Sequence, residues 1–288
     1  MEDLSIYLFW TGLLLAGLAT IFYAVYAASG AVAIRRFAAE TGAGTVSVSV
    51  PSSGPNPGLG RLATTFAAFT ALALAGAIAA RWAAIGHTPL SNMYEFTVAF
   101  AFGIIVAYLG FETTTGLRRM GVVALPMVAA MLGIATLFPS EVVPLIPALQ
   151  NARLLTIHVT CMMASYAVLT VAFAGAAVYL AQGGEGGRRI AWLPSANAAG
   201  DLAHRATMVG FPLLGLGIAL GAWWANDAWG RYWGWDPKET SALVTWLIYA
   251  GYLHARGLRR WRGKRAAGIL VLGYVGVLFT YFAVNLWV

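Results

Sequence analysis

The sequence predicts an all-α integral membrane protein, a bundle of about eight transmembrane helices. Hydrophobic residues make up 60% of the 288 positions and charged residues only 10%. A soluble globular domain carries about 25% charged residues, so most of this chain does not face water. Apolar runs of about 20 residues recur along it, and each can cross a hydrocarbon core about 30 Å thick.

The predicted spans follow one another along the chain with short connections. They cover residues 6–30, 62–85, 92–111, 121–138, 154–181, 206–224, 240–257 and 267–288. Arg81 lies near the end of the second span, where a long cation is expected to reach the membrane surface. Residues 43–60 are rich in Pro, Gly and Ser, which indicates a flexible loop. The chain therefore divides into residues 1–60, the first span with its loop, and residues 61–288, the main membrane domain.

The distribution of basic residues predicts the orientation of the bundle. Of the 18 Lys and Arg residues, 14 lie on the side of the odd-numbered loops and 4 on the other side. Basic residues concentrate on the cytoplasmic side of membrane proteins. Both termini are therefore predicted outside. The net charge of +7 is a topology signal, reinforced by anionic lipid in the bilayer, and it does not indicate a nucleic-acid partner.

An unusual concentration of tryptophan follows the sixth predicted span. Five of the 11 Trp residues lie between positions 223 and 235. The aromatic residues of this segment are Trp223, Trp224, Trp229, Tyr232, Trp233 and Trp235. An interfacial aromatic belt is one explanation, but a belt spreads over many spans. These rings gather in one predicted external loop between the sixth and seventh spans, and such a surface suits a flat, polarizable ligand such as a porphyrin.

The seventh span begins with a helix-start pattern. Asp236 at the N-cap, Pro237 at the first helical position and Glu239 at the third fit a capping box, which is a structural explanation for both acids. A ligand role is the alternative, because this helix N-terminus, with Arg231 and Lys238 beside it, can receive the propionate carboxylates of a heme.

Two histidines lie inside predicted spans, His158 near the outer end of the fifth and His254 far into the seventh. An ionisable side chain within a membrane is costly and marks a functional site by default, and imidazole is a common axial ligand of heme iron. A neutral histidine hydrogen-bonded between helices is the alternative for each. Their depths differ by about 15 Å at 1.5 Å per residue, so they cannot share one iron.

A third histidine, His87, lies in an outer loop and is either a further iron ligand or a solvated residue. Asn92 and Glu95 behind it predict a capping box for the third span. No motif for a nucleophile, a phosphate loop or a bare metal ion is present, so catalytic residues stay unassigned and iron is expected only through heme. Cys161 is the single cysteine, so another protein must supply any reduced thiols.

Residues 210–256, which include WGRYWGWDPKET, resemble the WWD-domain signature of heme-handling proteins, with the WWD loop at about 223–240. The segments PLSNMYEF (89–96), LLTIHVTCMMASYA (154–167) and FTYFAVNL (279–286) are similar to the same family. That family is CcsA, also called ResC, or CcsB in some lineages, of System II cytochrome c biogenesis. The resemblance covers the chain from about residue 61 onward.

The resemblance implies a protein that binds heme b, carries it to the outer face and presents it for attachment to the CxxCH motif of apocytochrome c. It implies a CcsB/ResB-type membrane partner in a heme-attachment synthase (heme lyase) complex, with thiol-reducing proteins acting indirectly. Whether this chain is itself an enzyme stays open. The expected location is a bacterial plasma (inner) membrane, with the WWD loop on the periplasmic side.

By position, the resemblance assigns His158 to the outer heme ligand and His254 to the intramembrane ligand where heme enters. The family usually places a second outer histidine after the segment that resembles residues 279–286, and none follows it in this sequence. A longer chain, a partner or His87 is the alternative source. The competing functions are a System I-type heme-delivery protein, a secondary transporter of a small hydrophobic solute and a purely structural subunit.

Overall fold

The computed structural model describes residues 1–40, 54–141, 152–258, 261 and 263–283. The described residues are helical and contain no strand, which confirms the predicted helix bundle. The elements are α1 (Glu2–Glu40), α2 (Pro57–Ile85), α3 (Met93–Thr115), η1 (Arg118–Met120), α4 (Gly121–Ala135), α5 (Ala152–Ala181), α6 (Ala196–Trp229), α7 (Pro237–Gly257), α8 (Lys264–Leu278) and the π-helical turn η4 (Phe279–Ala283). Most of the predicted loop 43–60, and the segment 284–288, lie outside the described residues.

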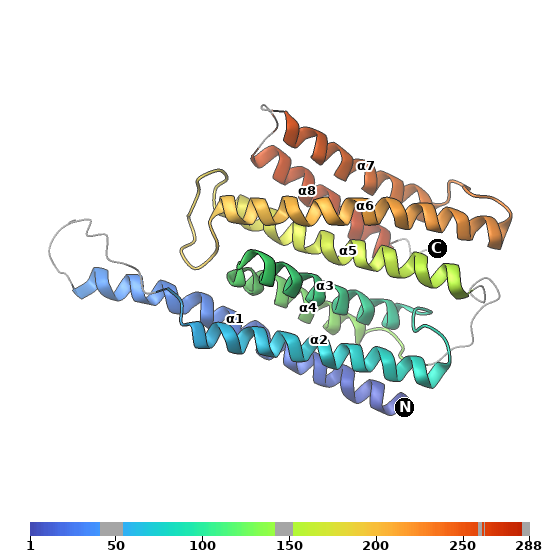
Figure 1. The fold of residues 1–288 in the computed structure, drawn as a ribbon, viewed down its shortest axis with the longest axis horizontal. Coiled ribbons are helices and arrows are strands. Elements are labelled where there is room, and N and C mark those ends of the chain that lie inside the picture. Colours follow the sequence, from blue (N-terminus) through green and yellow to red (C-terminus); the bar gives the residue numbers. More distant parts are fainter. Residues whose placement is uncertain (41–53, 142–151, 259–260, 262, 284–288) are drawn as a thin grey trace.

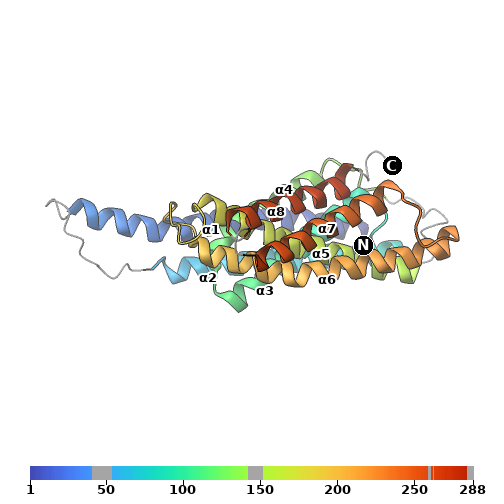
Figure 2. The same ribbon diagram turned by 90° about the horizontal axis from the view of Figure 1, so that it is seen from above.

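The long helices alternate in direction along the long axis of the molecule (Figures 1 and 2). One end holds the connection from α6 to α7, residues 230–236, and is called the tryptophan end. At the opposite end α5 and α7 finish and α6 and α8 begin, and this is called the arginine end. Seven of the helices in the described part of the chain are long and apolar enough to cross a membrane. The eighth, α7, is less apolar.

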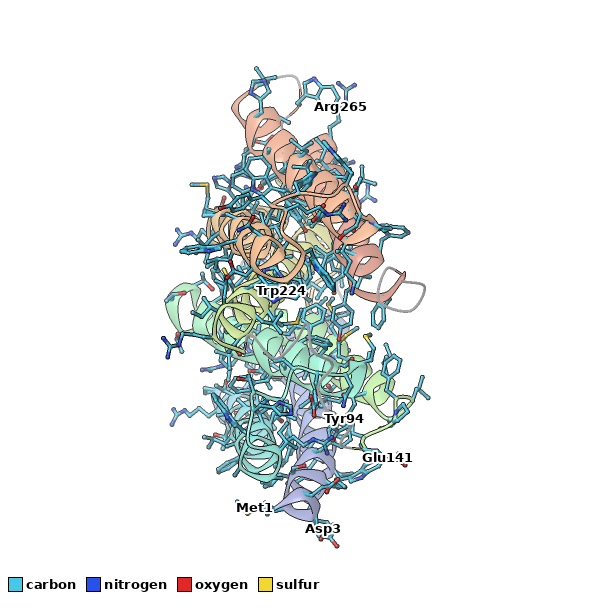
Figure 3. The ribbon with its side chains drawn as sticks, turned by 90° about the vertical axis from the view of Figure 1, so that its right-hand side faces the viewer. Met1, Asp3, Tyr94, Glu141, Trp224 and Arg265 are labelled. Atoms are coloured by element: carbon cyan, nitrogen blue, oxygen red, sulfur yellow. The ribbon has the colours of Figure 1, made fainter. Side chains whose placement is uncertain are left out.

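The cross-section of the bundle is elongated. In the end-on view α1 and α2 lie at one edge and α7 and α8 at the other, with α3 to α6 between them (Figure 3). α1 packs along α2, α3 contacts α4 and α5, α5 packs along α6, and α8 packs on both α5 and α7.

A buried carboxylate joins the helices of the first half. Glu112 on α3 is 5% exposed. It accepts hydrogen bonds from the hydroxyls of Tyr23 (2.5 Å), Thr64 (2.5 Å) and Tyr108 (2.6 Å), and from Nε of Arg118 (3.0 Å). Buried charges need such partners, so this cluster fixes α1, α2, α3 and η1 to one another.

Arg81 is buried within the bundle at the end of α2. The residue is 2% exposed, because Nε pairs with the buried carboxylate of Glu95 at 3.0 Å and Nη2 donates to the Ser140 carbonyl at 2.5 Å. Its level relative to the membrane surface stays a prediction. The capping interaction predicted for the third span forms in part. The Asn92 side chain accepts from Glu95 N at 2.9 Å, whereas the Glu95 carboxylate accepts from Ser91 N and Oγ.

α5 and α6 pack closely, in antiparallel directions, and their contact positions the candidate site. Three side chains of α5 bond to successive turns of α6: His158 Nδ1 to Gly217 O (2.8 Å), Cys161 Sγ to Leu213 O (3.3 Å) and Ser165 Oγ to Gly210 O (2.9 Å). Side chains at these spacings share one helix face, so the bonds fix the register of α5 against α6.

The α6 helix is longer than predicted at both ends. It continues to Trp229 and ends where Gly230 adopts a left-handed conformation (φ 72°). Trp223, Trp224 and Trp229 are therefore helical, and the predicted loop from 223 is wrong over that part. The connection is only 230–236, because tryptophan tolerates a helix and glycine supplies the stop.

Candidate functional site

A cavity of about 280 Å³ lies at the tryptophan end, where side chains from α3, α5, α6, α7, η4 and the 230–236 connection converge. Its walls are Phe96, Leu155, His158, Val159, Met162, Met163, Tyr166, Ile218, Gly221, Ala222, Trp224, Ala225, Trp229, Trp233, Asp236, Lys238, Glu239, Ala242, Thr280 and Tyr281. Seven of the residues predicted as site residues are among them: His158, Trp224, Trp229, Trp233, Asp236, Lys238 and Glu239.

His158 is held with one ring nitrogen defined. Nδ1 lies 2.8 Å from Gly217 O, and a carbonyl oxygen only accepts hydrogen bonds. Nδ1 therefore carries the proton in the neutral ring, and Nε2 keeps its lone pair. This is the arrangement in which a ligating histidine is oriented by a hydrogen bond from its other nitrogen.

Two glycines of α6 make room for this histidine. A Cβ added at Gly221 would lie 2.6 Å from His158 Cε1, and one added at Gly217 would lie 2.5 Å from Met162 Sδ. Both distances are well below ordinary van der Waals contact. The imidazole can therefore lie flat against α6 only because these positions lack side chains.

Three indole rings, those of Trp224, Trp229 and Trp233, line one part of the cavity. Trp224 and Trp229 pack edge to face, with centroids 6.3 Å apart, and Trp233 packs in the same way on Trp235 at 5.7 Å. The Trp224 indole nitrogen is buried and has no hydrogen-bond partner in the described part of the chain. A buried N–H without an acceptor costs about 1–3 kcal/mol, so this wall fits a ligand that brings an acceptor group.

The acidic residues of the site have a structural role. Asp236 and Glu239 form the predicted capping box at the start of α7, with Glu239 N donating to Asp236 Oδ1 at 2.8 Å. The Glu239 carboxylate also accepts from Gly234 N at 2.7 Å. Trp235, between these bonds, has a φ of 56°, a conformation uncommon for a bulky residue. Glu239 therefore holds the backbone that places Trp233 on the cavity.

The other predicted site residues lie outside this cavity. Trp223, Tyr232 and Trp235 are more than half exposed, and Arg231 lies over Gly234. His254 is exposed in the last turn of α7, at the arginine end. His87 is half-buried, and its Nδ1 lies 3.0 Å from Thr88 O. His158 and His254 are thus at opposite ends of the bundle, as predicted.

Several wall residues were not predicted as site residues. Met162, Met163 and Tyr166 follow His158 at helical spacing, so the face of α5 was readable from the sequence. Phe96, Thr280 and Tyr281 come from distant segments, and Thr97 Oγ1 lies 2.8 Å from Tyr281 OH, which joins α3 to η4. No sequence pattern predicts that contact. No group of three or more His, Cys, Asp or Glu side chains able to hold a bare metal ion occurs among the described residues.

These features define a class of protein: a multi-pass helical bundle with an apolar, tryptophan-lined cavity that contains one unprotonated imidazole nitrogen and one unpaired indole N–H. Residues 90–288 match the cytochrome c assembly protein family. The cytochrome c biogenesis protein CcsA of Porphyra purpurea is 35% identical over 272 residues, covering 79% of this chain and 85% of the relative. That of Microcystis aeruginosa is 36% identical over 283 residues, covering 80% and 85%. The chain therefore belongs to the CcsA family of cytochrome c biogenesis.

A solved structure shows the same fold. The chain is similar to cytochrome c heme lyase CcmF with a TM-score of 0.57 and 18% identity, over 96% of this chain and 46% of that one. The chain thus spans about half the length of that protein. At this identity the likeness concerns the arrangement of the helices.

Proposed function

We propose that this chain holds heme at the tryptophan end through His158 and presents it there for attachment to apocytochrome c. Membership of the CcsA family gives the chain a role in cytochrome c biogenesis and heme handling. The observation that supports the particular site is the His158 ring, whose Nδ1 is bonded to Gly217 O and whose Nε2 is left for iron.

Each wall of the cavity has a part in this proposal. Trp224, Trp229 and Trp233 offer apolar faces to the porphyrin, while the Trp224 N–H and the Lys238 ammonium supply donors for its propionates. Arg231, Asp236 and Glu239 then shape and cap the connection. At 280 Å³ the cavity is near the lower limit of about 300 Å³ for small-molecule sites, so it holds part of a heme and leaves the rest accessible.

Heme carries two vinyl groups, and each forms a thioether by addition of one cysteine thiol. The chain contributes orientation, because a held reactant reacts much faster than a free one. The single cysteine, Cys161, donates to Leu213 O between α5 and α6 and does not line the cavity. The thiols are therefore assigned to the CxxCH motif of the apocytochrome, kept reduced by other proteins.

The second heme ligand at this end is proposed to be His87. Thr88, the next residue, has its Oγ1 3.1 Å from Thr156 Oγ1 on α5, two positions before His158. The loop that carries His87 therefore lies against the same helix as His158. An unchanged heme spectrum and an unchanged cytochrome c yield in His87→Ala would remove this residue from the site.

The remaining assignments concern the assembly. The tryptophan end is proposed to face the periplasm or its equivalent, with the basic residues of the arginine end in the cytoplasm. His254, in the last turn of α7, is proposed as a heme ligand on the entry side. A CcsB/ResB-type membrane protein is the proposed partner, and the pair is proposed to act as the heme lyase.

The test is the absorption spectrum, oxidised and reduced, of the protein purified with its partner from cells supplied with heme. We expect a Soret band with sharp α and β bands. His158→Ala should remove or shift these bands, and His254→Ala should lower the amount of heme carried. His204→Ala, a histidine of α6 outside the cavity, is the control and should leave them unchanged. A folded, colourless wild-type complex would contradict heme binding, and unchanged bands in His158→Ala would contradict the ligand assignment.

A further inference from the structure

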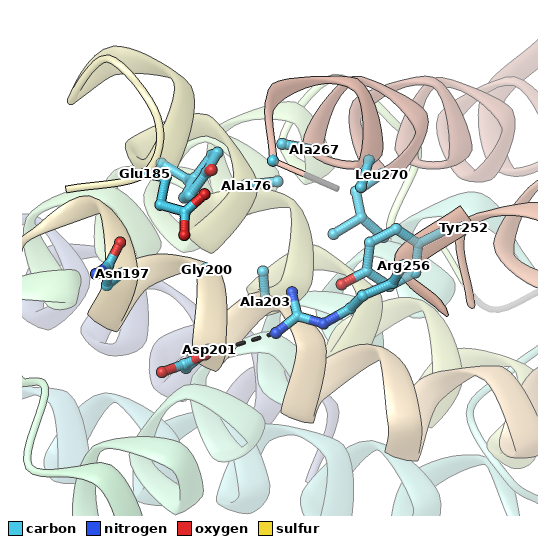
Figure 4. Close-up of a pocket in the computed structure, with 13 residues that line it drawn as sticks. Ala176, Glu185, Asn197, Gly200, Asp201, Ala203, Tyr252, Arg256, Ala267 and Leu270 are labelled. Carbon is cyan, nitrogen blue, oxygen red and sulfur yellow. Dashed lines mark ion pairs between the residues drawn. The ribbon is translucent and has the colours of Figure 1, made fainter. Parts of the chain in front are cut away.

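A second cavity lies at the other end of the bundle. It measures about 470 Å³ and lies between the end of α5, the start of α6, the end of α7 and the start of α8. The residues that carry the argument are Tyr179, Glu185, Asp201, Arg256 and Leu270. Figure 4 shows Glu185 and Arg256 facing this space from opposite sides. None of its lining residues belongs to the tryptophan-end cavity.

Small side chains create this space. Ala176, Gly200, Ala203, Ala266 and Ala267, from three helices, form its floor. The deepest lining residue on α8 is Leu270, six positions after Lys264, or about 9 Å along the helix. A bilayer has about 5–8 Å of headgroup region on each side of its hydrocarbon core. The cavity therefore extends from headgroup level to the edge of the hydrocarbon.

The charges that line the cavity are unequal. Arg256 pairs with Asp201 across the α6–α7 gap at 3.5 Å, so its charge is matched (Figure 4). Glu185 makes no ion pair with any described residue. Among the residues that line the cavity, the Glu185 carboxylate therefore has no ionic partner in the described part of the chain, and it can receive a cationic group.

A hydroxyl also lines the cavity. Tyr179 is 8% exposed as a residue, and its OH makes no hydrogen bond with another residue of the described part of the chain. A Cβ added at Gly263, another lining residue, would lie 3.3 Å from this oxygen. This hydroxyl can donate or accept a hydrogen bond, so it can pair with a ligand that has a hydrogen-bonding head.

Basic side chains flank the acidic position. A Cβ at Gly183 would lie 2.7 Å from Arg189 Nε, and a Cβ at Gly184 would lie 2.8 Å from Lys264 Cε. Arg189 and Lys264 therefore pack over the turn that immediately precedes Glu185. The exposed Glu185 carboxylate at the mouth of the cavity, with positive charges beside it, is the complement of a headgroup that carries both an ammonium and a phosphate.

We propose that the arginine-end cavity binds a zwitterionic phospholipid with a primary ammonium headgroup, such as phosphatidylethanolamine. The ammonium, with its three donors, lies between Glu185 and Asp201 and donates to Tyr179 OH. The phosphate lies at Arg189 and Lys264, and an acyl chain follows Leu270 toward the hydrocarbon. This site stands on its own residues and does not depend on heme binding at the other end.

The test uses the full chain in detergent, equilibrated in micelles that contain equal amounts of phosphatidylethanolamine, phosphatidylcholine and phosphatidylglycerol. Lipid retained after gel filtration is quantified by mass spectrometry. We expect phosphatidylethanolamine to exceed phosphatidylcholine by about tenfold, because a quaternary ammonium has no N–H to donate. Glu185→Gln, in an exposed loop, and Tyr179→Phe should each abolish this preference. Glu141→Gln, an exposed acid near the opposite end, is the matched control and should preserve it.

Three results would overturn the proposal. They are equal retention of the ethanolamine and choline lipids, preferred retention of anionic phosphatidylglycerol, or an unchanged preference in Glu185→Gln. Free phosphoethanolamine separates the lipid from its headgroup. We expect it to displace the lipid only at far higher concentration, and equal affinity would contradict the choice of a lipid. The heme spectrum is recorded on the same samples, so failure here is distinguishable from failure of the heme site.

Discussion

The cavities at the two ends of α5 to α8 are built from opposite kinds of residue. At the tryptophan end bulky rings, two methionines and one oriented imidazole enclose 280 Å³, and an indole N–H is unpaired. At the arginine end alanines and glycines leave 470 Å³, and the lining includes three charged side chains, those of Glu185, Asp201 and Arg256. α5, α6 and α7 contribute to both cavities, while α3 and η4 reach only the first and α8 lines only the second. The difference between the cavities therefore lies in a few residues near the helix ends.

The largest effect on heme binding is expected from filling the space that His158 occupies. Gly221→Ala adds a methyl 2.6 Å from its Cε1, so the ring must move from Gly217 O. We expect the ratio of heme to protein to fall below that of the wild type, because the ring then no longer presents Nε2 in the same position. Gly251→Ala, on α7 with open space around it, is the matched control. Equal heme content in the two variants would contradict the positioning role of Gly221.

The next largest effect is expected from removing a single N–H group at the tryptophan end. Trp224→Phe keeps an aromatic wall and removes the unpaired N–H. If heme supplies the acceptor, its loss should weaken binding by about 1.5–3 kcal/mol, about 10- to 100-fold, whereas the ligand-free protein should be no less stable. Heme titration measures the affinity, and thermal unfolding measures the stability of the ligand-free protein.

Trp246→Phe is the control for this change. Its indole nitrogen is also buried and unpaired, but it lies against Gly215, outside the cavity. Heme affinity should not change in this variant. A Trp224→Phe protein that binds heme and its dimethyl ester with wild-type affinity would show that the N–H does not contact the ligand.

A smaller effect is expected from the connection itself. Glu239→Ala removes the acceptor for Gly234 N and one half of the capping box. Loss of such a cap costs about 1 kcal/mol, and thermal unfolding in detergent should report it. Trp235→Gly should recover part of that loss, because glycine adopts a φ of 56° without strain. A Glu239→Ala protein as stable as wild type would contradict this account.

The last substitution, Glu185→Gln, is expected to leave heme binding unchanged. Glu185→Gln alters the arginine-end cavity only, so its Soret band and heme content should equal those of the wild type. A shifted band would mean that the two cavities are coupled through the helices, and the comparison of independent ends would then fail.

The sequence predicted the helices well and their contacts poorly. The eight predicted spans each correspond to a helix, and seven of the described helices are long and apolar enough to cross a membrane. Hydropathy misplaced the end of α6, where Trp223, Trp224 and Trp229 read as a loop although they are helical until Gly230. It also gave no sign that Arg81 is buried, since nothing local to it shows that Glu95 is its partner.

The same limit applies to the candidate site. His158, the tryptophans and the Asp236 cap were recognisable from residue type and spacing. Phe96 and Tyr281 were not, because they reach the cavity only through the packing of α3 and η4 on α5. Neither the partner of an interhelical hydrogen bond nor the space left by a glycine has a signal in a single sequence.

The weak hydropathy of α7 bears on how the chain enters a bilayer. Lys238 and Glu239 begin this helix, and Arg256 lies in its last turn, so it gains less from lipid than its neighbours do. Its buried face is complementary to α8. A Cβ at Gly273 would meet the Tyr249 ring at 2.9 Å, and one at Gly276 would meet Thr245 Oγ1 at 2.7 Å. We expect α7 to insert as a hairpin with α8, so a chain that ends before Lys264 should leave α7 outside the membrane and the tryptophan connection untethered.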